Sequence, residues 1–217
     1  MLKVDQTYVL LLVDLKGSTA MPAAAREPLF ERLEEVIGRW NRRRKDRAEL
    51  PISLAYGDEV AALFDRVTLA GDLLGELRSA LAPEGALRFA VVRGKIGRES
   101  RDIRQVGGDV FKRASAAIDQ LKRSRGFGAW QVGDELENAT LEALTTLVFA
   151  TLENMTPWQR EVYQALAAGR TQVEIAESTG RAQQSISDAA RRGGAAHVIA
   201  AEQVLARWWE KLDRVSD

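Results

Sequence analysis

A short apolar run near the start of the chain, from Thr7 to Asp14, constrains the fold more than any other segment. It is too short for a helix, and it ends at an acidic residue that is soon followed by Gly17. A continuous apolar run of this length, without alternation, is typical of a strand that is buried on both faces. We therefore expect the N-terminal part of the chain to be built on a sheet that contains this strand.

The segments after this strand alternate between helical and strand-like patterns. Apolar residues recur at helical spacing in two stretches, and short apolar runs bounded by turn residues lie between them. The order β-α-β-β-α-β is that of a ferredoxin-like or palm arrangement, in which helices pack on one face of an antiparallel sheet and leave the other face or the strand tips free. We expect these elements at 7–14, 28–44, 52–56, 60–64, 68–81 and 87–92, with Thr68 as the cap of the second helix.

The rest of the chain completes this α+β domain and adds an all-α domain. A charged, glycine-flanked loop at 94–108 precedes a helix at 109–124 that Asp109 caps, and a last strand falls within 126–132. We place the α+β domain at 1–135, a connecting helix at 136–155 and a C-terminal helical domain at 156–217.

The segment from Thr171 to Gly193 has the spacing of a helix-turn-helix. Ala176, Gly180 and Ile186 supply a small residue where two helices touch, a glycine at the turn and an aliphatic anchor for the second helix. The second helix then exposes amides and hydroxyls that suit base edges, and arginines that suit phosphate or guanine. The predicted DNA-binding residues are Thr171, Gln183, Gln184, Ser185, Ser187, Arg191 and Arg192.

A plain helical hairpin with a solvated polar face is the alternative interpretation of this segment, and Asp188 disfavours close contact with phosphate. Thr156 is predicted to cap the preceding helix and Thr171 the first helix of the motif. The tail at 198–212 is apolar enough to pack on this domain or to pair with a second chain. A homodimer is expected because symmetric DNA half-sites favour dimers.

The composition excludes several kinds of site. The chain has no cysteine and His197 is its single histidine, which rules out thiol chemistry and most histidine-based metal or triad sites. Basic and acidic residues both number 31, so the net charge is zero and any DNA-binding surface must be local. No apolar stretch approaches the roughly 20 residues of a membrane-spanning helix, and no signal peptide is evident. We expect a cytoplasmic protein without a membrane partner.

Acidic residues lie at neighbouring strand ends in the predicted sheet. Asp14 ends the first strand, while Asp58 and Glu59 lie at the hairpin tip, which in a palm arrangement is beside that strand. Such carboxylates can hold Mg²⁺ or Mn²⁺ together with nucleotide phosphates, and the glycine turn that begins at Gly17 can cradle phosphate. Each acid alone is equally compatible with a turn or capping role.

Three motifs resemble a known family. Asp14-Leu-Lys-Gly-Ser-Thr19 and Gly57-Asp-Glu-Val-Ala-Ala-Leu-Phe64 are similar to the two metal-aspartate motifs of class III nucleotidyl cyclases. The chain resembles the SatD family more closely still, through this hairpin, a helix like Gly107-Gly-Asp-Val-Phe-Lys-Arg-Ala114 and a C-terminal helix-turn-helix. The resemblance spans nearly the whole chain and implies a cyclase-like domain coupled to a DNA-binding module.

The chain departs from the cyclases at residues that their chemistry uses. Leu54 stands where they have a base-reading lysine, and Lys112 and Ala116 align approximately with their transition-state residues. Without a positioned cation the charge that develops in phosphoryl transfer is poorly stabilised, although Lys112, Arg113 or Arg93 are candidate substitutes. The resulting site prediction is Asp14, Asp58 and Glu59 for a metal, and Gly17, Ser18, Thr19, Lys112 and Arg113 for a nucleotide.

Two functions follow from these motifs. The first is a regulatory protein that binds double-stranded DNA and has a degenerate cyclase-like domain, which senses a nucleotide or metal and is not an enzyme. The alternative is an active nucleotidyl cyclase or related phosphoryl-transfer enzyme that uses Mg²⁺ or Mn²⁺ at Asp14 and Asp58. A scaffold that binds protein partners through both domains is a third interpretation. The complete helix-turn-helix pattern and the missing cyclase residues favour the first.

Overall fold

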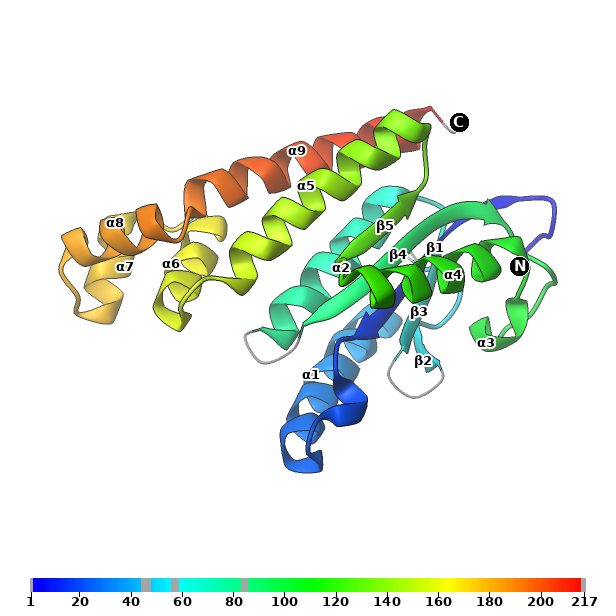
Figure 1. The fold of residues 1–217 in the computed structure, drawn as a ribbon, viewed down its shortest axis with the longest axis horizontal. Coiled ribbons are helices and arrows are strands. Elements are labelled where there is room, and N and C mark those ends of the chain that lie inside the picture. Colours follow the sequence, from blue (N-terminus) through cyan, green and yellow to red (C-terminus); the bar gives the residue numbers. More distant parts are fainter. Residues whose placement is uncertain (1, 44–47, 56–58, 83–85, 216–217) are drawn as a thin grey trace. The chain divides into compact units, whose positions relative to one another are not determined.

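Strand β1 (Thr7–Leu15) forms where the apolar run predicts it and pairs antiparallel with a neighbour on each side. The computed structural model describes residues 2–43, 48–55, 59–82 and 86–215, without the side chains of Thr19 and Ala55. Within these residues β1 is the middle strand of a mixed five-stranded sheet, β2-β3-β1-β4-β5 (Figure 1). The other strands are β2 (Ser53–Ala55), β3 (Glu59–Phe64), β4 (Leu87–Lys95) and β5 (Gly128–Gln131). With its many helices, the protein therefore has the expected α+β fold.

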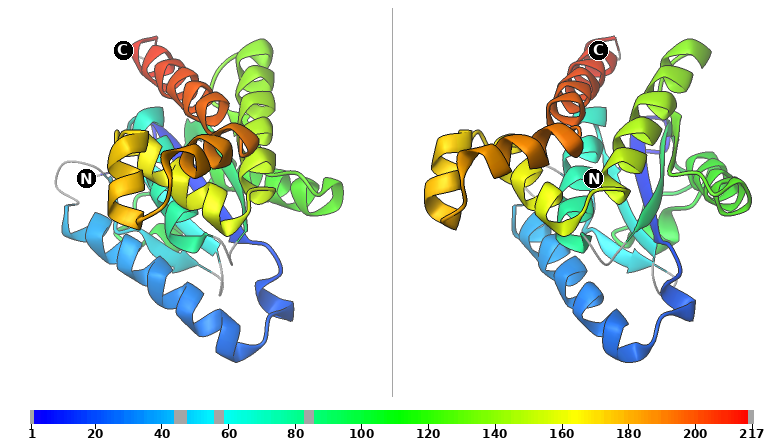
Figure 2. Two further views of the ribbon diagram at one scale, coloured as in Figure 1. Left: turned by 90° about the vertical axis from the view of Figure 1, so that its left-hand side faces the viewer. Right: turned by 60° about the vertical axis from the view of Figure 1, so that its left-hand side comes forward.

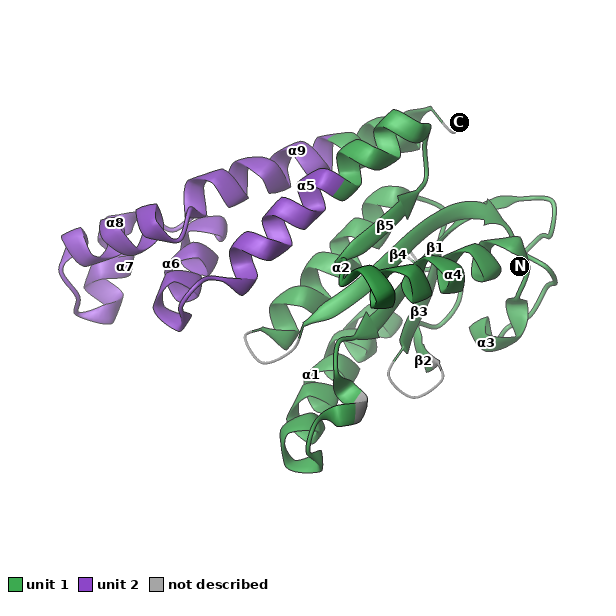
Figure 3. Ribbon diagram, viewed as in Figure 1, with its two compact units in different colours: residues 1–142, 208–217 green, residues 143–207 purple. Residues whose placement is uncertain are grey.

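The chain divides into two units, residues 1–142 with 208–217 and residues 143–207 (Figure 3). Unit 1 holds the sheet, and unit 2 is helical. Helices α5 (Glu135–Glu153) and α9 (Ala195–Arg214) each contribute residues to both units. None of the helices found in the described ranges is both long enough and apolar enough to cross a membrane.

Helices cover both faces of the unit 1 sheet. Leu10 and Leu12 of β1 share a buried cluster with residues of α4 (Asp109–Ser124) and of the short α3 (Ile103–Val106), which forms within the predicted loop. Helices α1 (Ala23–Arg42) and α2 (Val67–Leu81) lie on the other face (Figure 2). The sequence leaves open that one sheet face is free, but α4 packs on that face in this chain.

The caps predicted from the sequence for α2 and α4 are wrong. The first N–H groups of α2, from Val67 and Thr68, donate to the Asp213 carboxylate at 2.6 and 3.1 Å, so the cap of this helix comes from the end of α9. Asp109 is the first residue of α4 and follows Gly108, which occupies the cap position without a side-chain hydrogen bond. Gly108 has a φ of 101°, a region that favours glycine.

The end of α9 packs on unit 1, whereas the sequence favours packing on the C-terminal helices or on a second chain. Trp209 stacks on Trp130 of β5 with ring centroids 5.9 Å apart. A Cβ atom on Gly71 of α2 would lie 2.4 Å from the Trp209 ring, so only glycine permits this approach. Nη2 of Arg93 donates to the Leu212 carbonyl at 3.1 Å. These contacts explain why the end of α9 belongs to unit 1.

Unit 2 is held together by a small apolar core among short helices. Val162, Ile175, Ile186 and Ala189 are its buried members. They come from α6 (Pro157–Ala167), α7 (Gln172–Thr179) and α8 (Gln183–Arg192).

Both predicted caps in unit 2 are confirmed. Thr156 and Gln159 form a capping box at the start of α6, and Thr171 and Glu174 form a second one at the start of α7. Each box satisfies backbone N–H groups that a helix start leaves without partners. The starts of both helices are therefore fixed by residues close in sequence.

Candidate functional site

Asp14 lies at the end of the central strand, on the face that α4 covers. It pairs across the sheet with Glu59 of β3 on one side and with Arg88 of β4 on the other. Its side chain is only 5% exposed. Two carboxylates and one guanidinium group therefore come from one row of residues across three adjacent strands.

Cations from the same chain bind both carboxylate oxygens of Asp14. Nη1 of Arg88 donates to Oδ2 at 2.8 Å, and Nζ of Lys122, near the end of α4, lies 2.9 Å from Oδ1. The same Nζ lies 4.0 Å from Oε1 of Glu59. We call these four residues the Asp14 cluster; its two formal positive charges balance its two negative charges.

The two cations of the Asp14 cluster differ in exposure. The side chain of Arg88 is 17% exposed and that of Lys122 is 42% exposed, so Lys122 covers Asp14 from the more open side. The hydrogen bond to Asp14 raises the pKa of Lys122, against the lowering effect of its partial burial. Lys122 is therefore a stable ammonium ion at neutral pH.

This arrangement does not fit a divalent cation at Asp14. Mg²⁺ binds oxygen ligands at about 2.1 Å in octahedral geometry, but each Asp14 oxygen already accepts a bond from a cationic donor. Among the residues that the structure describes, no group of three or more acidic or histidine side chains is placed to hold a metal ion. Of the other two predicted ligands, Glu59 belongs to the Asp14 cluster and Asp58 lies outside the described residues.

The predicted phosphate-binding turn directly follows β1. Gly17 has a left-handed backbone with φ of 75°, and Ser18 is buried. Thr19 belongs to the same short 3₁₀ helix. The turn thus begins three residues after Asp14, as the sequence predicts.

Lys112 and Arg113, the predicted phosphate cations, lie near the start of α4. Nη1 of Arg113 donates to the main-chain carbonyl of Arg93, which pairs with β1 five residues before Asp14, or about 17 Å along a strand. Within this chain the structure therefore does not bring the two residues to Asp14. Helix α4 approaches Asp14 through its last turn, and there the cation is Lys122.

Sequence reasoning missed Arg88 and Lys122. Opposite charges on paired antiparallel strands often lie directly across from each other, which points to Arg88 once β1 and β4 are aligned. Lys122 follows the buried Ile118 by four residues, so it lies beside the apolar stripe of α4. Both signals need the strand register or the docked face of α4, which the sequence alone leaves open.

Helix α8 presents the second candidate surface, in unit 2. Ile186 and Ala189 point into the core, and the polar residues on the rest of the helix remain accessible. Gln183, Gln184, Arg191 and Arg192 are exposed, and Ser185 and Ser187 are half-buried. We call these six residues the α8 face. Thr171, the remaining predicted DNA contact, uses its hydroxyl to accept from the Glu174 N–H at 3.2 Å and donate to its Oε2 at 2.9 Å.

The two arginines of the α8 face differ in their contacts. Nη2 of Arg191 donates to Oδ1 of Asp188 at 3.0 Å, a bond that lowers the pKa of this carboxyl. The side chain of Arg192 makes no hydrogen bond or ion pair with any residue that the structure describes. Exposed pairs such as Arg191 with Asp188 are worth at most about 1 kcal/mol, so either guanidinium group can turn to an outside anion.

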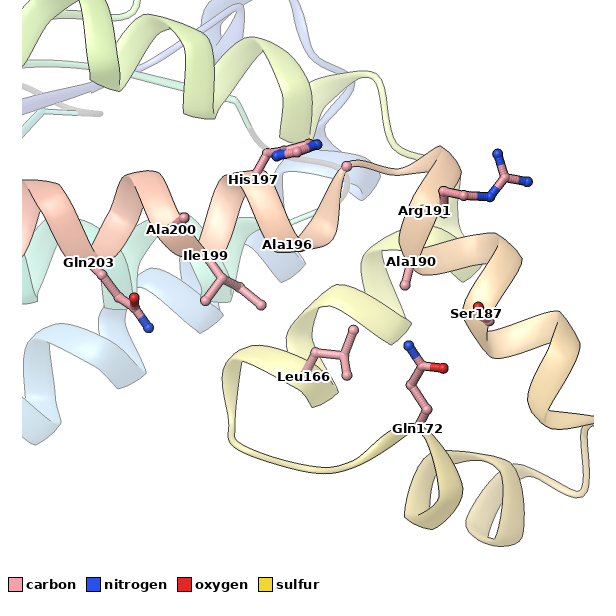
Figure 4. A pocket seen from close by; sticks show the side chains of 11 residues that line it. Leu166, Gln172, Ser187, Ala190, Arg191, Ala196, His197, Ile199, Ala200 and Gln203 are labelled. Carbon is pink, nitrogen blue, oxygen red and sulfur yellow. The ribbon is translucent and has the colours of Figure 1, made fainter.

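A hollow of about 600 Å³ lies beside the α8 face (Figure 4). Leu166 of α6, Gln172 of α7 and Ile199 of α9 point into it from three helices. Ser187 and Arg191 also line it, so it is continuous with the α8 face.

No family model and no curated protein matches the chain. Among solved structures it is similar to a bacterial light-regulated adenylyl cyclase, with 13% sequence identity and a TM-score of 0.37 over 57% of this chain and 74% of that chain. A likeness at this level carries no argument about fold or activity.

Proposed function

We propose that the protein is a DNA-binding regulator that reads double-stranded DNA with α8. The observation that carries the proposal is the geometry of α7 and α8. Thr171 fixes the start of α7, Gly180 turns the chain with a φ of 64°, and Ile186 anchors α8 in the core. This geometry supports the proposal of a helix-turn-helix, a motif whose second helix enters the major groove.

The chemistry of the α8 face supports this role. Glutamine amides can pair with adenine, arginines can pair with guanine or phosphate, and serine hydroxyls can bond to several bases. All six side chains are at least partly accessible. The α8 face therefore offers accessible groups that can pair with bases and with phosphate.

The charge of unit 2 makes a dimer part of the proposal. Residues 143–207 contain six arginines, no lysine and six acidic residues, so the unit as a whole does not attract phosphate. Binding of DNA by one copy is then weak, because phosphate neutralisation supplies much of the affinity of such modules. A homodimer that places two α8 helices in successive major grooves, about 34 Å apart, gains the missing contacts.

For unit 1 we propose a cyclase-like regulatory domain that binds a nucleotide without catalysing phosphoryl transfer. The first four strands have the order β2-β3-β1-β4 with antiparallel pairing, which agrees with a ferredoxin-like β-α-β-β-α-β core. The backbone of the turn from Gly17 to Thr19 is the proposed phosphate contact. The contacts of Asp14 with Arg88 and Lys122 disfavour the alternative of an active, metal-dependent cyclase.

A DNA titration tests the main proposal. Fluorescence anisotropy with a random-sequence duplex library, and then with enriched duplexes, measures binding at several salt concentrations from about 50 mM upward. We expect Arg191→Ala with Arg192→Ala to weaken binding by about tenfold or more and to lower the salt slope by about two.

Arg207→Ala is the matched control for this titration, since Arg207 is an exposed arginine of unit 2 that lies on α9, outside the α8 face. It should bind enriched duplexes like the unchanged protein. Equal binding by the double variant, or no binding by the unchanged protein at low salt, would contradict the proposal.

Incubation with each nucleoside triphosphate and Mn²⁺ tests the enzymatic alternative. We expect no cyclic nucleotide and no pyrophosphate release. Turnover that disappears in Asp14→Asn and in Asp58→Ala would establish the cyclase activity instead, and would remove the claim that unit 1 is degenerate.

A further inference from the structure

The position of Lys122 resembles that of a metal ion between two carboxylates. Its Nζ lies 2.9 Å from Oδ1 of Asp14 and 4.0 Å from Oε1 of Glu59, which face each other across β1 and β3. Arg88 binds the other oxygen of Asp14 from β4. A single ammonium group thus lies between two acids, closer to Asp14 than to Glu59.

We infer that Lys122 is a built-in counter-ion that takes the place of a divalent metal at Asp14 and closes this carboxylate to Mg²⁺ and Mn²⁺. A metal ion can bind Oδ1 only if the ammonium group leaves, because two cations cannot share one buried carboxylate oxygen without strong repulsion. Departure of Lys122 would leave Arg88 as the one cation among the described residues that binds Asp14. The inference concerns unit 1 alone and does not depend on DNA binding by α8.

The exposure of the cluster makes Lys122 the residue that decides access. Arg88 projects from the sheet and is mostly buried, while Lys122 reaches Asp14 from the more open side. Its position near the end of α4 is fixed by Ile118 and Leu121, which pack on the sheet. The apolar stem of the lysine can therefore hold the ammonium group over Asp14 without large motions of the helix.

This arrangement defines the kind of ligand that unit 1 can take near β1. A nucleotide or other phosphate compound has to bind without a metal bridge to Asp14. Its phosphates would have to be held by backbone N–H groups or by side-chain cations, since Asp14 and Glu59 carry negative charge that repels phosphate.

Binding of Mn²⁺ to the full chain tests the inference without any enzymatic readout. Electron paramagnetic resonance reports free Mn²⁺, and thermal unfolding with and without Mn²⁺ reports ions that bind the folded state. The variants are Lys122→Met and Lys122→Gln, which keep most of the side-chain length and remove its charge. Lys122→Arg retains the charge, and Arg123→Ala removes a neighbouring exposed cation of α4.

We expect the two neutral variants to bind Mn²⁺ at least about tenfold more tightly than the unchanged protein, since carboxylate oxygens are ligands that such ions prefer. Adding Asp14→Asn to either variant should abolish the gain. Lys122→Arg and Arg123→Ala should behave like the unchanged protein.

Two results would overturn the inference. One is tight Mn²⁺ binding by the unchanged protein that Asp14→Asn removes, because Asp14 would then be open to metal. The other is folded Lys122→Met and Lys122→Gln variants that gain no Mn²⁺ affinity, because Lys122 would then not be what closes the carboxylate.

Discussion

The Asp14 cluster and the α8 face place similar side chains in opposite settings. At Asp14, cations of the chain bind both oxygens of a nearly buried carboxylate. Along α8, amides and guanidinium groups are exposed, and the ion pair between Arg191 and Asp188 lies at the surface. One set of charges is balanced within the fold, and the other remains available to a partner.

This difference in exposure and pairing indicates where the protein can respond to an outside ligand. Removing one member of a buried ion pair leaves a charge with neither water nor partner, whereas an exposed pair exchanges with solvent at little cost. The same residue types therefore stabilise unit 1 and form the proposed binding surface in unit 2. A predicted site is better judged by the contacts that its polar atoms already make than by the residue types present.

The largest expected effect is the loss of stability on removing Asp14. Asp14→Ala leaves Arg88, which is mostly buried, without its carboxylate, and should lower the free energy of unfolding by about 3 kcal/mol. The matched change on the α8 face, Arg191→Ala with Arg192→Ala, should alter it by no more than about 0.5 kcal/mol. Urea denaturation at neutral pH measures both. Equal costs for the two changes would remove the contrast between the sites.

A smaller effect is expected at the turn that orients the α8 face. Gly180 has a φ of 64° and open space around its Cβ position, so Gly180→Ala should cost about 1 kcal/mol through the backbone alone. Gly75 of α2 also has open space around its Cβ position but lacks a positive φ, so Gly75→Ala should stabilise unit 1 slightly. Chemical denaturation should thus give opposite signs, and a stabilising Gly180→Ala would argue against this turn.

The smallest effect concerns the pH dependence of the Asp14 cluster. Bonding to Asp14 raises the pKa of Lys122, so its contribution to stability is fully present below about pH 10.4, the ordinary lysine value. The contribution falls as the pH rises through the higher pKa of the folded state. The stability difference between the unchanged protein and Lys122→Met should therefore shrink in urea titrations above that pH. A difference that stays constant or grows would contradict the ion pair.

Local features of both units could be predicted from the sequence. The apolar run of β1 identified a buried strand, and Thr156 and Thr171 identified two helix starts, because these signals need only neighbouring residues. The cap of α2 could not be predicted, because Asp213 lies 146 residues beyond Val67 along the chain.

The candidate sites follow the same division. The pattern of α8 separates buried from accessible positions by helical periodicity alone, and the predicted accessible side chains agree with the structure. The Asp14 cluster depends on the register of β1 against β4 and on which end of α4 docks near Asp14. Long-range packing decides both, so Arg88 and Lys122 could not be predicted from the sequence as the cations beside Asp14.

The most direct test of DNA binding by α8 is amide hydrogen exchange of the full chain with and without an enriched duplex. The account predicts slower exchange across residues 171–192 in the complex, with the Arg191→Ala and Arg192→Ala double variant losing this protection. Protection confined to the sheet of unit 1, or no protection anywhere at a duplex concentration that saturates binding, would contradict it.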